Sequence, residues 1–448
     1  MNILLIFPRI NYLYPHVSTK NEFLNKIFGE AVSLTLPQVA AATPQHHSVE
    51  IVDENYEPLS FTDDVDLVGI TCCTMTAMRA YEIADRFRSL HVPVVIGGTH
   101  ATAVPAEAKI HADSVVVGEA ELTWPQLLKD FEEGGLQPFY VSTEAIPSES
   151  IPEPRRDLIK RKLFSDGLLI KRGCPNHCEF CSIASLSSKD VRPLENVLRE
   201  IHHISSKDIF IYDSNLTWNM EYNQGLFQGL KNLNKRWQAN GTINMLGRDD
   251  DFLDQAKEIG LYNWFIGFES VSQKSLDSIK KTHNRVDEYG AAIKRIKDHG
   301  MVIVGSFIFG FDGDTVDIFD TTLQALQAWG VEMAEFHILT PFPGTVLFDR
   351  LKKENRILTQ DWNAYTYVNV VYQPKNMTRE ELYNGTRSIA LRFYSLPNVA
   401  KRFLSTLKRT KNLYLSYYVL MRNLKYRERY KNQFALHKGK KNEWNMEG

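Results

Sequence analysis

Several kinds of sequence feature are scarce in this chain of 448 residues. Its 18 prolines and 25 glycines are too few and too scattered for a collagen or a linker-dominated protein, and the odd count of 5 cysteines argues against a disulfide framework. The longest apolar runs, near 67–78 and 301–311, fall short of the roughly 18 residues that a membrane span needs. The short apolar start at 1–8 has no basic segment and is interpreted as a strand, not a signal peptide. The composition predicts a cytoplasmic globular protein of roughly three domains.

Charge is unevenly distributed although its sum is only −2. Residues 401–448 hold 13 lysines and arginines against three glutamates, and the first 400 hold 39 basic and 51 acidic residues. An acidic body binds nucleic acid poorly because phosphate contacts need clustered cations, so a nucleic-acid partner is not expected. The aromatic-rich basic tail has two interpretations: amphipathic helices that pack on the remaining chain, or peripheral contact with an anionic membrane, which would suit a lipid-like substrate.

The first 145 residues alternate short apolar strands with helical patterns at 34–42 and 81–88. The strands are expected at 2–7, 49–52, 65–71, 92–96 and 114–117. Continuous rather than alternating apolar strands are typical of a parallel sheet that is buried on both faces. We therefore predict an α/β fold that begins with a doubly wound, Rossmann-like domain at 1–145. Its ligands are expected at the carboxyl ends of the strands.

Beyond a linker at 146–154 the alternation resumes. Six strands, all but the last followed by a helical pattern, are expected at 168–172, 208–213, 236–242, 264–269, 302–309 and 335–340. Six βα units predict a partial (β/α)6 barrel of TIM type at 155–357, short of the usual eight. The remaining 358–448 are expected to form a mostly helical, basic C-terminal extension after a strand at 365–372.

Three cysteines lie within eight residues: Cys174, Cys178 and Cys181. They follow the first barrel strand, at the end where barrel enzymes place their chemistry. Three thiolates are one fewer than the four that close a structural zinc or iron–sulfur site, so a four-iron cluster would keep one iron open. The alternatives are a zinc site completed by His177 and a purely structural or electron-transfer cluster. Cys72 and Cys73 are expected to be small packed residues.

This CxxxCxxC spacing, in a six-unit barrel, resembles the radical S-adenosylmethionine superfamily over about 165–354. The resemblance implies that the three cysteines hold a 4Fe–4S cluster whose fourth iron binds S-adenosylmethionine, with Phe180 against the adenine. Further contacts with S-adenosylmethionine are implied for the strand-end residues Asp213, Asn215, Glu269, Ser270, Gly310 and Pro341. Asp213 stands where the family often has Gly-Gly-Glu, and Glu269 could instead be an ion-paired core carboxylate.

The loops of the first domain resemble the cobalamin-binding domain that precedes many radical S-adenosylmethionine barrels, over roughly 1–140. Adjacent glycines at 97–98 would let the backbone approach a large planar ligand. The residues implied to contact cobalamin are Thr74, Met75, Thr76, Gly97, Gly98, Thr99, His100, Gly118, Glu119 and Glu121. The DxHxxG signature that places a histidine beneath cobalt is absent. His100 is expected to meet the ligand edge or solvent, with axial ligation of cobalt as the alternative. For the whole domain, the alternative is a scaffold that binds no corrinoid.

Together these resemblances imply an enzyme that uses a 4Fe–4S cluster, S-adenosylmethionine and cobalamin. They favour a methyltransferase in which a 5′-deoxyadenosyl radical activates an unreactive carbon that then takes methyl from methylcobalamin. A cyclase or rearrangement enzyme would need the same cofactors, and a non-catalytic corrinoid or redox-sensing protein is the alternative from another class. The expected partners are a small-molecule, lipid-like substrate and a reductant of flavodoxin or ferredoxin type.

Overall fold

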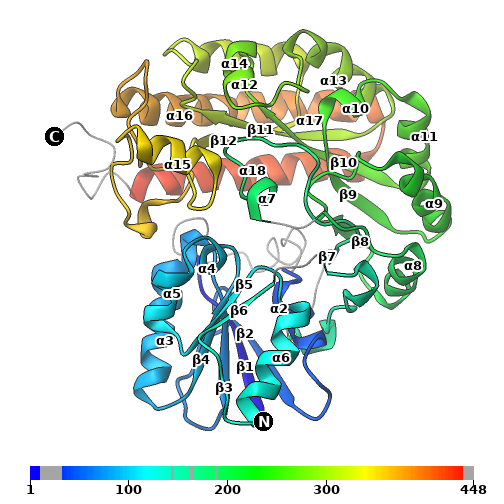
Figure 1. The fold of residues 1–448 in the computed structure, drawn as a ribbon. Helices are drawn as coiled ribbons and strands as arrows, with labels where there is room; N and C mark the ends of the chain where they lie inside the picture. The colour runs from blue at the N-terminus through cyan, green and yellow to red at the C-terminus, as the bar shows by residue number, and fades with distance from the viewer. Residues whose placement is uncertain (11–32, 143–145, 161–164, 187–188, 437–448) are drawn as a thin grey trace.

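Two six-stranded parallel sheets organise the chain in a computed structural model (Figure 1). The structure describes residues 1–10, 33–142, 146–160, 165–186 and 189–436. The first sheet forms one α/β unit, and the second sheet lies above it in Figure 1 with the C-terminal helices around it. The end of the basic tail, 437–448, lies outside the described residues.

The first sheet has the order β2-β1-β3-β4-β5-β6 and contains the five expected strands. Its strands are β1 Asn2–Phe7, β2 Ser48–Asp53, β3 Leu67–Thr71, β4 Val94–Gly97, β5 Ser114–Val117 and the unpredicted edge strand β6 Phe139–Val141. Helices cover both faces (Figure 1): α3 Ala77–Ser89 and α5 Pro105–His111 on one, α2 Thr35–Ala41 and α6 Ala120–Glu132 on the other, with α4 Thr99–Ala103 after β4. Burial on both faces explains the continuous apolar runs and confirms the doubly wound prediction.

The second sheet has the order β12-β11-β10-β9-β8-β7, so each strand pairs with its neighbour along the chain, as in a partial barrel. Its strands are β7 Ser165–Leu168, β8 Asp208–Ile211, β9 Arg236–Gly241, β10 Leu261–Glu269, β11 Val302–Phe309 and β12 Met333–Ile338. The helices that alternate with them are α7 Ser182–Leu186, α8 Leu194–His203, α9 Met220–Leu230, α10 Ile243–Leu246, α11 Asp250–Glu258, α12 Gln273–Ser278, α13 Tyr289–Asp298, α14 Ile318–Trp329 and α15 Val346–Lys353.

Two strand predictions are wrong in an instructive way. The first barrel strand was expected at 168–172, but β7 ends at Leu168. Beyond that residue, the N–H groups of Ile170 and Lys171 donate to the side chain of Asp213 instead of to the backbone of a neighbouring strand. The expected strand at 365–372 is irregular and follows a 3-10 helix, η5 Trp362–Ala364. Its apolar side chains are divided between two cores, since Val371 packs in the first unit and Tyr372 in the barrel.

Three helices complete the chain: α16 Arg379–Phe393, α17 Leu396–Thr410 and α18 Leu413–Leu436. Helix α18 crosses the amino-terminal ends of the barrel strands, where its tyrosines bond to β8, β9 and β12 through Tyr414–Asp208 at 3.2 Å, Tyr418–Gln238 at 2.9 Å and Tyr426–Glu335 at 2.8 Å. It therefore forms a floor under the barrel. None of the described helices is both long and apolar enough to cross a membrane.

Candidate active site

The three clustered cysteines lie on the loop between β7 and α7, which other barrel segments hold in place. Within the loop, the N–H of Cys181 donates to the carbonyl of Cys178 at 3.1 Å. Glu179 links the loop to two distant segments, because its N–H donates to the Ile279 carbonyl at 3.2 Å and its carboxylate accepts from Arg350 Nε at 3.2 Å. The cysteines therefore sit on an anchored loop at the carboxyl end of the barrel.

The thiols of these cysteines lie close enough to influence one another electrostatically. Burial raises the pKa of Cys178 to about 11, the ammonium of Lys281 opposes that rise, and Cys181 and Cys174 add to it. Burial also raises the pKa of Cys181, so these two thiols favour the protonated form unless a cation compensates the thiolate charge, which is what an iron cluster would provide. His177 is exposed, which argues against the alternative zinc site. The donor set therefore fits a three-cysteine 4Fe–4S cluster.

A cavity of about 640 Å³, which we call the bore, runs through the barrel from this loop. At the carboxyl end of the strands it is lined by Phe180, Cys181, Glu269, Thr340, Phe342 and Tyr367. Its lining also includes Tyr262, near the start of β10. Tyr262 lies seven residues before Glu269 on this strand, or roughly 23 Å away at about 3.3 Å per residue. The bore thus spans nearly the full height of the barrel.

Glu269 points into the bore from a strained position at the end of β10. Its φ of +62° lies in the left-handed region, which is uncommon for a residue other than glycine, and the pairing with β11 shifts register there. Its Oε1 accepts from Lys281 Nζ at 2.6 Å. Backbone strain of this kind is concentrated at functional sites. Glu269 is therefore both an ion-paired carboxylate and a wall of the bore.

The other residues implied to contact S-adenosylmethionine are buried nearby but do not line the bore. Asp213 is fully buried, and its Oδ1 accepts from the N–H groups of Ile170 at 2.8 Å and Lys171 at 2.9 Å, while burial raises its pKa to about 6. The side chain of Asn215 accepts a hydrogen bond from the N–H of Thr217. Ser270, Gly310 and Pro341 follow strand ends, and the N–H of Gly310 donates to Asp314 at 3.0 Å. Their contacts to S-adenosylmethionine remain predictions.

A second cavity of about 360 Å³, here called the edge cavity, lies at the carboxyl edge of the first sheet. Six of the residues implied to contact cobalamin line it: Gly97, Gly98, Thr99, Gly118, Glu119 and Glu121. Gly98 has φ +100°, and a Cβ there would come within 2.6 Å of the Cys72 carbonyl oxygen. Only glycine therefore lets the backbone take this path beside the cavity. The glycine-rich rim fits a large ligand that approaches the backbone closely.

The remaining residues implied to contact cobalamin lie elsewhere. Thr74, Met75 and Thr76 form a 3-10 helix, η1 Thr74–Thr76, and do not line the edge cavity. The expectation that His100 meets solvent is wrong, because its ring is fully buried. Its Nδ1 lies 3.1 Å from Thr74 Oγ1 and its Nε2 lies 3.4 Å from Glu107 Oε1, which also accepts from Trp362 Nε1 at 2.7 Å. Glu107 thus links His100 of the first unit to Trp362 of the C-terminal segment.

The two cavities are neighbours, and the cysteine loop lies between them. Ile183 of α7, two residues after Cys181, lines both. Arg172, two residues before Cys174, pairs with Glu119 and Glu121 of the first unit and also lines the edge cavity. The segment 172–183 therefore separates a site on the first sheet from a site inside the barrel.

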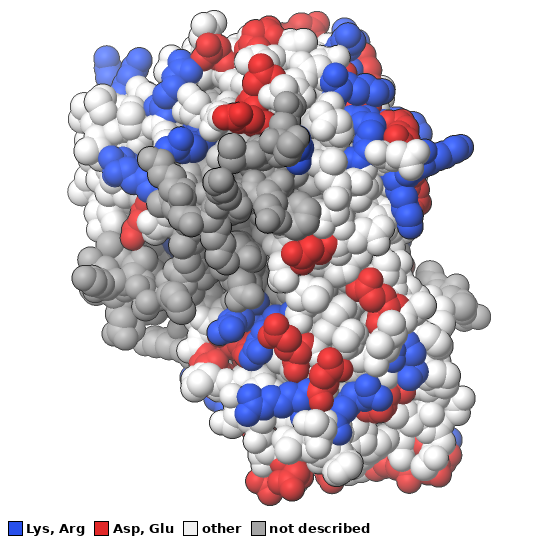
Figure 2. Space-filling model, turned by 90° about the vertical axis from the view of Figure 1, so that its left-hand side faces the viewer, with Lys and Arg blue, Asp and Glu red and all other residues white. Residues whose placement is uncertain are grey.

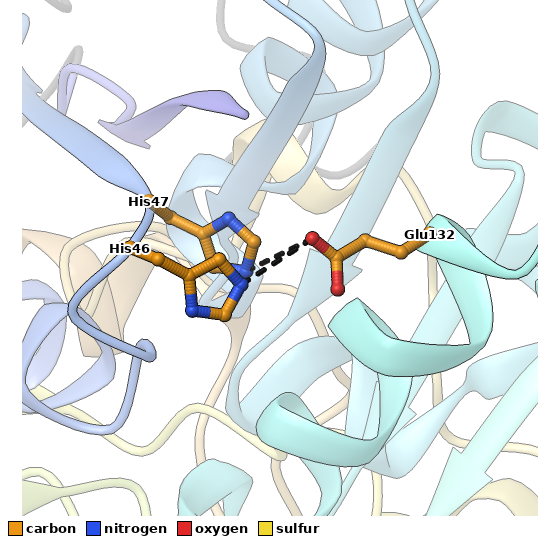
Figure 3. A group of neighbouring side chains, drawn as sticks. All are labelled: His46, His47 and Glu132. Atoms are coloured by element: carbon orange, nitrogen blue, oxygen red, sulfur yellow. Dashed lines mark hydrogen bonds and ion pairs between the residues drawn. The ribbon is translucent and has the colours of Figure 1, made fainter.

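Among the described residues, one group of His, Cys, Asp and Glu side chains brings its ligand atoms within 4.8 Å of one another, and it lies at the opposite edge of the first sheet. His46 and His47 precede β2, and their Nε2 atoms lie 3.4 Å and 3.8 Å from Glu132 Oε1 at the end of α6 (Figure 3). Burial and the neighbouring His46 lower the pKa of His47. The side chains of His46 and Glu132 are 64% and 41% exposed, so we interpret these two as a surface ion pair.

Sequence reasoning missed three contributors to the cysteine loop and the bore. Lys281 reaches the cysteine loop from about 100 residues away, and no local motif marks it. Tyr367, with φ +63°, lies in the segment that was predicted to be a strand. A stripe of α18 also faces the bore: Tyr414, Tyr418, Arg422, Tyr426 and Arg429. The near-constant spacing of four residues in this stripe can be read from the sequence, but the sequence does not indicate which surface the stripe faces.

Comparison with known proteins agrees with this geometry. Residues 168–326 match the family model for the radical SAM superfamily, and residues 23–128 match the B12 binding domain. The chain is 30% identical to the bacteriochlorophyllide d C-12(1)-methyltransferase of Chlorobaculum tepidum over 86% of this chain and 88% of that protein. It is also 30% identical to the C-8(2)-methyltransferase of that organism, over 75% and 80%.

Among solved structures, the fold is similar to OxsB, a cobalamin-dependent S-adenosylmethionine radical enzyme with aqua-cobalamin and S-adenosylmethionine bound. The TM-score is 0.65 at 15% identity, over 97% of this chain and 72% of that one. The similarity covers both units and the order in which they occur. The chain therefore belongs to the radical S-adenosylmethionine superfamily, among the enzymes that carry a B12-binding domain and work with a 4Fe–4S cluster, S-adenosylmethionine and cobalamin.

Proposed function

We propose that this protein is a C-methyltransferase whose organic substrate lies in the bore and whose corrinoid lies in the edge cavity. The observation that carries the proposal is the position of Ile183, which lines both cavities directly after the cysteine loop. A methyl donor and its acceptor carbon must come within contact of each other. Two adjoining cavities that meet at the cluster loop supply that arrangement, and the relatives named as methyltransferases support it.

In this scheme Cys174, Cys178 and Cys181 would hold the 4Fe–4S cluster, and Phe180 and Glu269 would contact S-adenosylmethionine at the top of the bore. When bound, the cluster and S-adenosylmethionine supply a radical that removes hydrogen from carbon, and cobalamin supplies the methyl group. The glycines at 97, 98 and 118 would let the corrinoid approach the backbone.

The chain's own contribution is enclosure and position. Aromatic and aliphatic side chains line much of the bore, which favours an apolar substrate and excludes water from a reactive carbon. Lys281 holds the carboxylate of Glu269 in a fixed orientation and lies beside the thiols. Arg172 ties the cysteine loop to the first unit, so that the two cavities keep a constant relation.

The test is anaerobic reconstitution followed by product analysis. The reconstituted protein should bind hydroxocobalamin near-stoichiometrically, with a change in its visible spectrum. Reduced with titanium citrate in the presence of substrate, it should release both S-adenosylhomocysteine and 5′-deoxyadenosine. Formation of 5′-deoxyadenosine alone would replace methylation with cyclisation or rearrangement, and no cleavage of S-adenosylmethionine would point to a non-catalytic corrinoid protein.

The finer partner assignments belong to the same proposal. We infer a lipid-like substrate, a reductant of flavodoxin or ferredoxin type, and peripheral contact with an anionic membrane. The membrane contact is supported by α17, where Leu396 and Leu404 are 55% and 60% exposed and Leu404 shares a face with the exposed Lys401 and Lys408. On the face that Figure 2 shows, acidic and basic side chains are interspersed.

Vesicle co-sedimentation tests the membrane contact. The protein should sediment with vesicles that contain phosphatidylglycerol and not with pure phosphatidylcholine. Leu404→Glu should abolish that binding without changing the iron content. Equal sedimentation of the variant and the wild type would rule out α17 as the contact.

A further inference from the structure

The group formed by His46, His47 and Glu132 has one member that ion pairing does not explain (Figure 3). His46 and Glu132 are exposed enough to form an ordinary surface pair. The side chain of His47 is only 1% exposed, and its Nε2 is buried without a hydrogen-bond partner. An ion pair with Glu132, 3.8 Å away, would need a protonated ring, but burial and the neighbouring His46 lower the pKa of His47. A buried nitrogen of this kind is costly unless a ligand binds it.

The three side chains direct their ligand atoms toward one another. Nε2 of His46 and Nε2 of His47 lie 3.4 Å and 3.8 Å from the same oxygen, Oε1 of Glu132, and all three atoms lie within 4.8 Å of one another. Nδ1 of His47 lies 3.4 Å from the nitrogen of Met1, so Nε2 is the atom that faces the group. Ligand atoms about 2.0–2.2 Å from a tetrahedral zinc ion are roughly 3.3 Å apart. The group therefore needs only a small closing movement, which the exposed ring of His46 can make.

We propose that His46, His47 and Glu132 bind Zn²⁺ through two imidazole nitrogens and one carboxylate oxygen. Imidazole together with carboxylate suits zinc, and three protein ligands leave one coordination position for water. None of the three residues lines the bore or the edge cavity. The inference therefore goes beyond the proposed function and does not depend on it.

The position of the group gives the metal a structural task. The two helices that it would join both begin at the edge cavity, which is lined by Leu36 in the first turn of α2 and by Glu121 in the first turn of α6. His46 and His47 follow the end of α2, and Glu132 is the last residue of α6. Glu121 and Glu132 are eleven residues apart, or roughly 16 Å at about 1.5 Å per residue. The zinc ion would therefore clamp the far ends of two helices whose near ends form a wall of the edge cavity.

Calorimetric titration of the untagged, reconstituted holoenzyme with Zn²⁺ tests the site, since the cluster then occupies its cysteines. The wild type should bind one Zn²⁺ per chain. His46→Ala and Glu132→Gln should each weaken binding more than about tenfold, because even the loss of a residue behind the ligands costs that much. His111→Ala is the matched control and should bind like the wild type. It removes a histidine that pairs with Asp85 at 2.9 Å in the same unit but belongs to no such group among the described residues.

X-ray absorption at the zinc edge identifies the ligands. The spectrum should show nitrogen and oxygen neighbours at about 2.0–2.1 Å and no sulfur, whereas sulfur at about 2.3 Å would place the zinc on cysteines and overturn the proposal. Zinc should also raise the thermal unfolding midpoint of the wild type but not that of Glu132→Gln, because a ligand stabilises only the state that binds it. An equal rise in both proteins would overturn the clamp. No zinc binding by the wild type, or wild-type affinity in both His46→Ala and Glu132→Gln, would overturn the site itself.

Discussion

The guanidinium of Arg172 pairs with the carboxylate of Glu121, and so joins the cysteine loop of the barrel to the rim of the edge cavity. Glu119 completes the same ion-pair group. Burial acts to lower the pKa of Arg172, but the two carboxylates outweigh it and the pKa is raised. The link fixes the first unit to the barrel at the point where the two cavities adjoin.

Replacing Arg172 with Met should weaken corrinoid binding while leaving the cluster in place. The change would remove the cation that Glu119 and Glu121 share on the wall of the edge cavity, and breaking a partly buried ion pair in this way is costly. We expect the dissociation constant for hydroxocobalamin to rise about tenfold, or about 1.4 kcal/mol, in a visible-absorption titration. Arg155→Met, which removes an exposed pair with Asp157, is the matched control. Unchanged affinity in the Arg172 variant would show that the link does not shape the edge cavity.

Replacing Cys178 with Ala should prevent assembly of the cluster. The three thiols are the complete ligand set in this assignment, and the two that remain would leave a second iron without a protein ligand. Iron and sulfide should fall to background, with loss of the absorbance near about 400 nm that is expected of a thiolate-held cluster. Cys73→Ala, in the first unit, should retain the wild-type iron content. Four irons per chain in the Cys178 variant would disprove the ligand assignment.

The strands were predictable because each sheet is buried on both faces. The residues 302–309 were expected as a strand from their composition, and β11 is Val302–Phe309. The prediction failed where a side chain replaced a strand partner, as Asp213 does beside Lys171. It also failed in the segment 365–372, where the apolar residues serve two different cores. The local sequence pattern predicts which side chains are buried, but it does not predict which part of the chain packs against them.

The candidate site was predictable where its chemistry is local. Short segments of sequence contain both the three spaced cysteines and the paired glycines at 97–98. Each of these segments follows a strand, so it lies at the carboxyl edge of its sheet as expected. Lys281 reaches the cysteine loop, and Arg422 reaches the bore, through tertiary contacts that no sequence window contains. His100 was itself a predicted ligand contact, but its ring turns into the protein interior, where Thr74 and Glu107 bond to it.

Replacing Gly98 with Ala should destabilise the first unit and impair corrinoid binding. The residue has φ +100°, and a Cβ would approach the carbonyl oxygen of Cys72 to 2.6 Å, so the loop must shift. A strained backbone of this kind costs about 1–3 kcal/mol. We expect a lower urea midpoint together with weaker binding of hydroxocobalamin. Gly135→Ala is the control, because the nearest atom to a Cβ there lies at an ordinary 3.6 Å. If both variants bound hydroxocobalamin like the wild type, the rim would not need glycine.

Replacing Asp312 with Asn should remove a pH-dependent part of the stability. Asp312 accepts from Arg356 Nη2 at 2.7 Å and Arg350 Nη1 at 2.9 Å, and lies 3.2 Å from Lys375 Nζ. Burial alone would raise its pKa, but these cations lower it from 3.8 to about 2. Because the folded-state pKa is below the unfolded one, the contribution is complete well above pH 3.8 and is lost as the pH falls toward about 2.

After allowance for solvent screening, we expect the variant to be about 1 kcal/mol less stable at pH 7, with about half of that difference gone at pH 3. Urea denaturation of the two proteins at pH 7, 5 and 3 measures it. Asp63→Asn, on the surface of the first unit, should change stability little at any of these pH values. A difference between the Asp312 variant and the wild type that stayed constant from pH 7 to 3 would mean that the carboxylate contributes through shape or hydrogen bonding rather than charge.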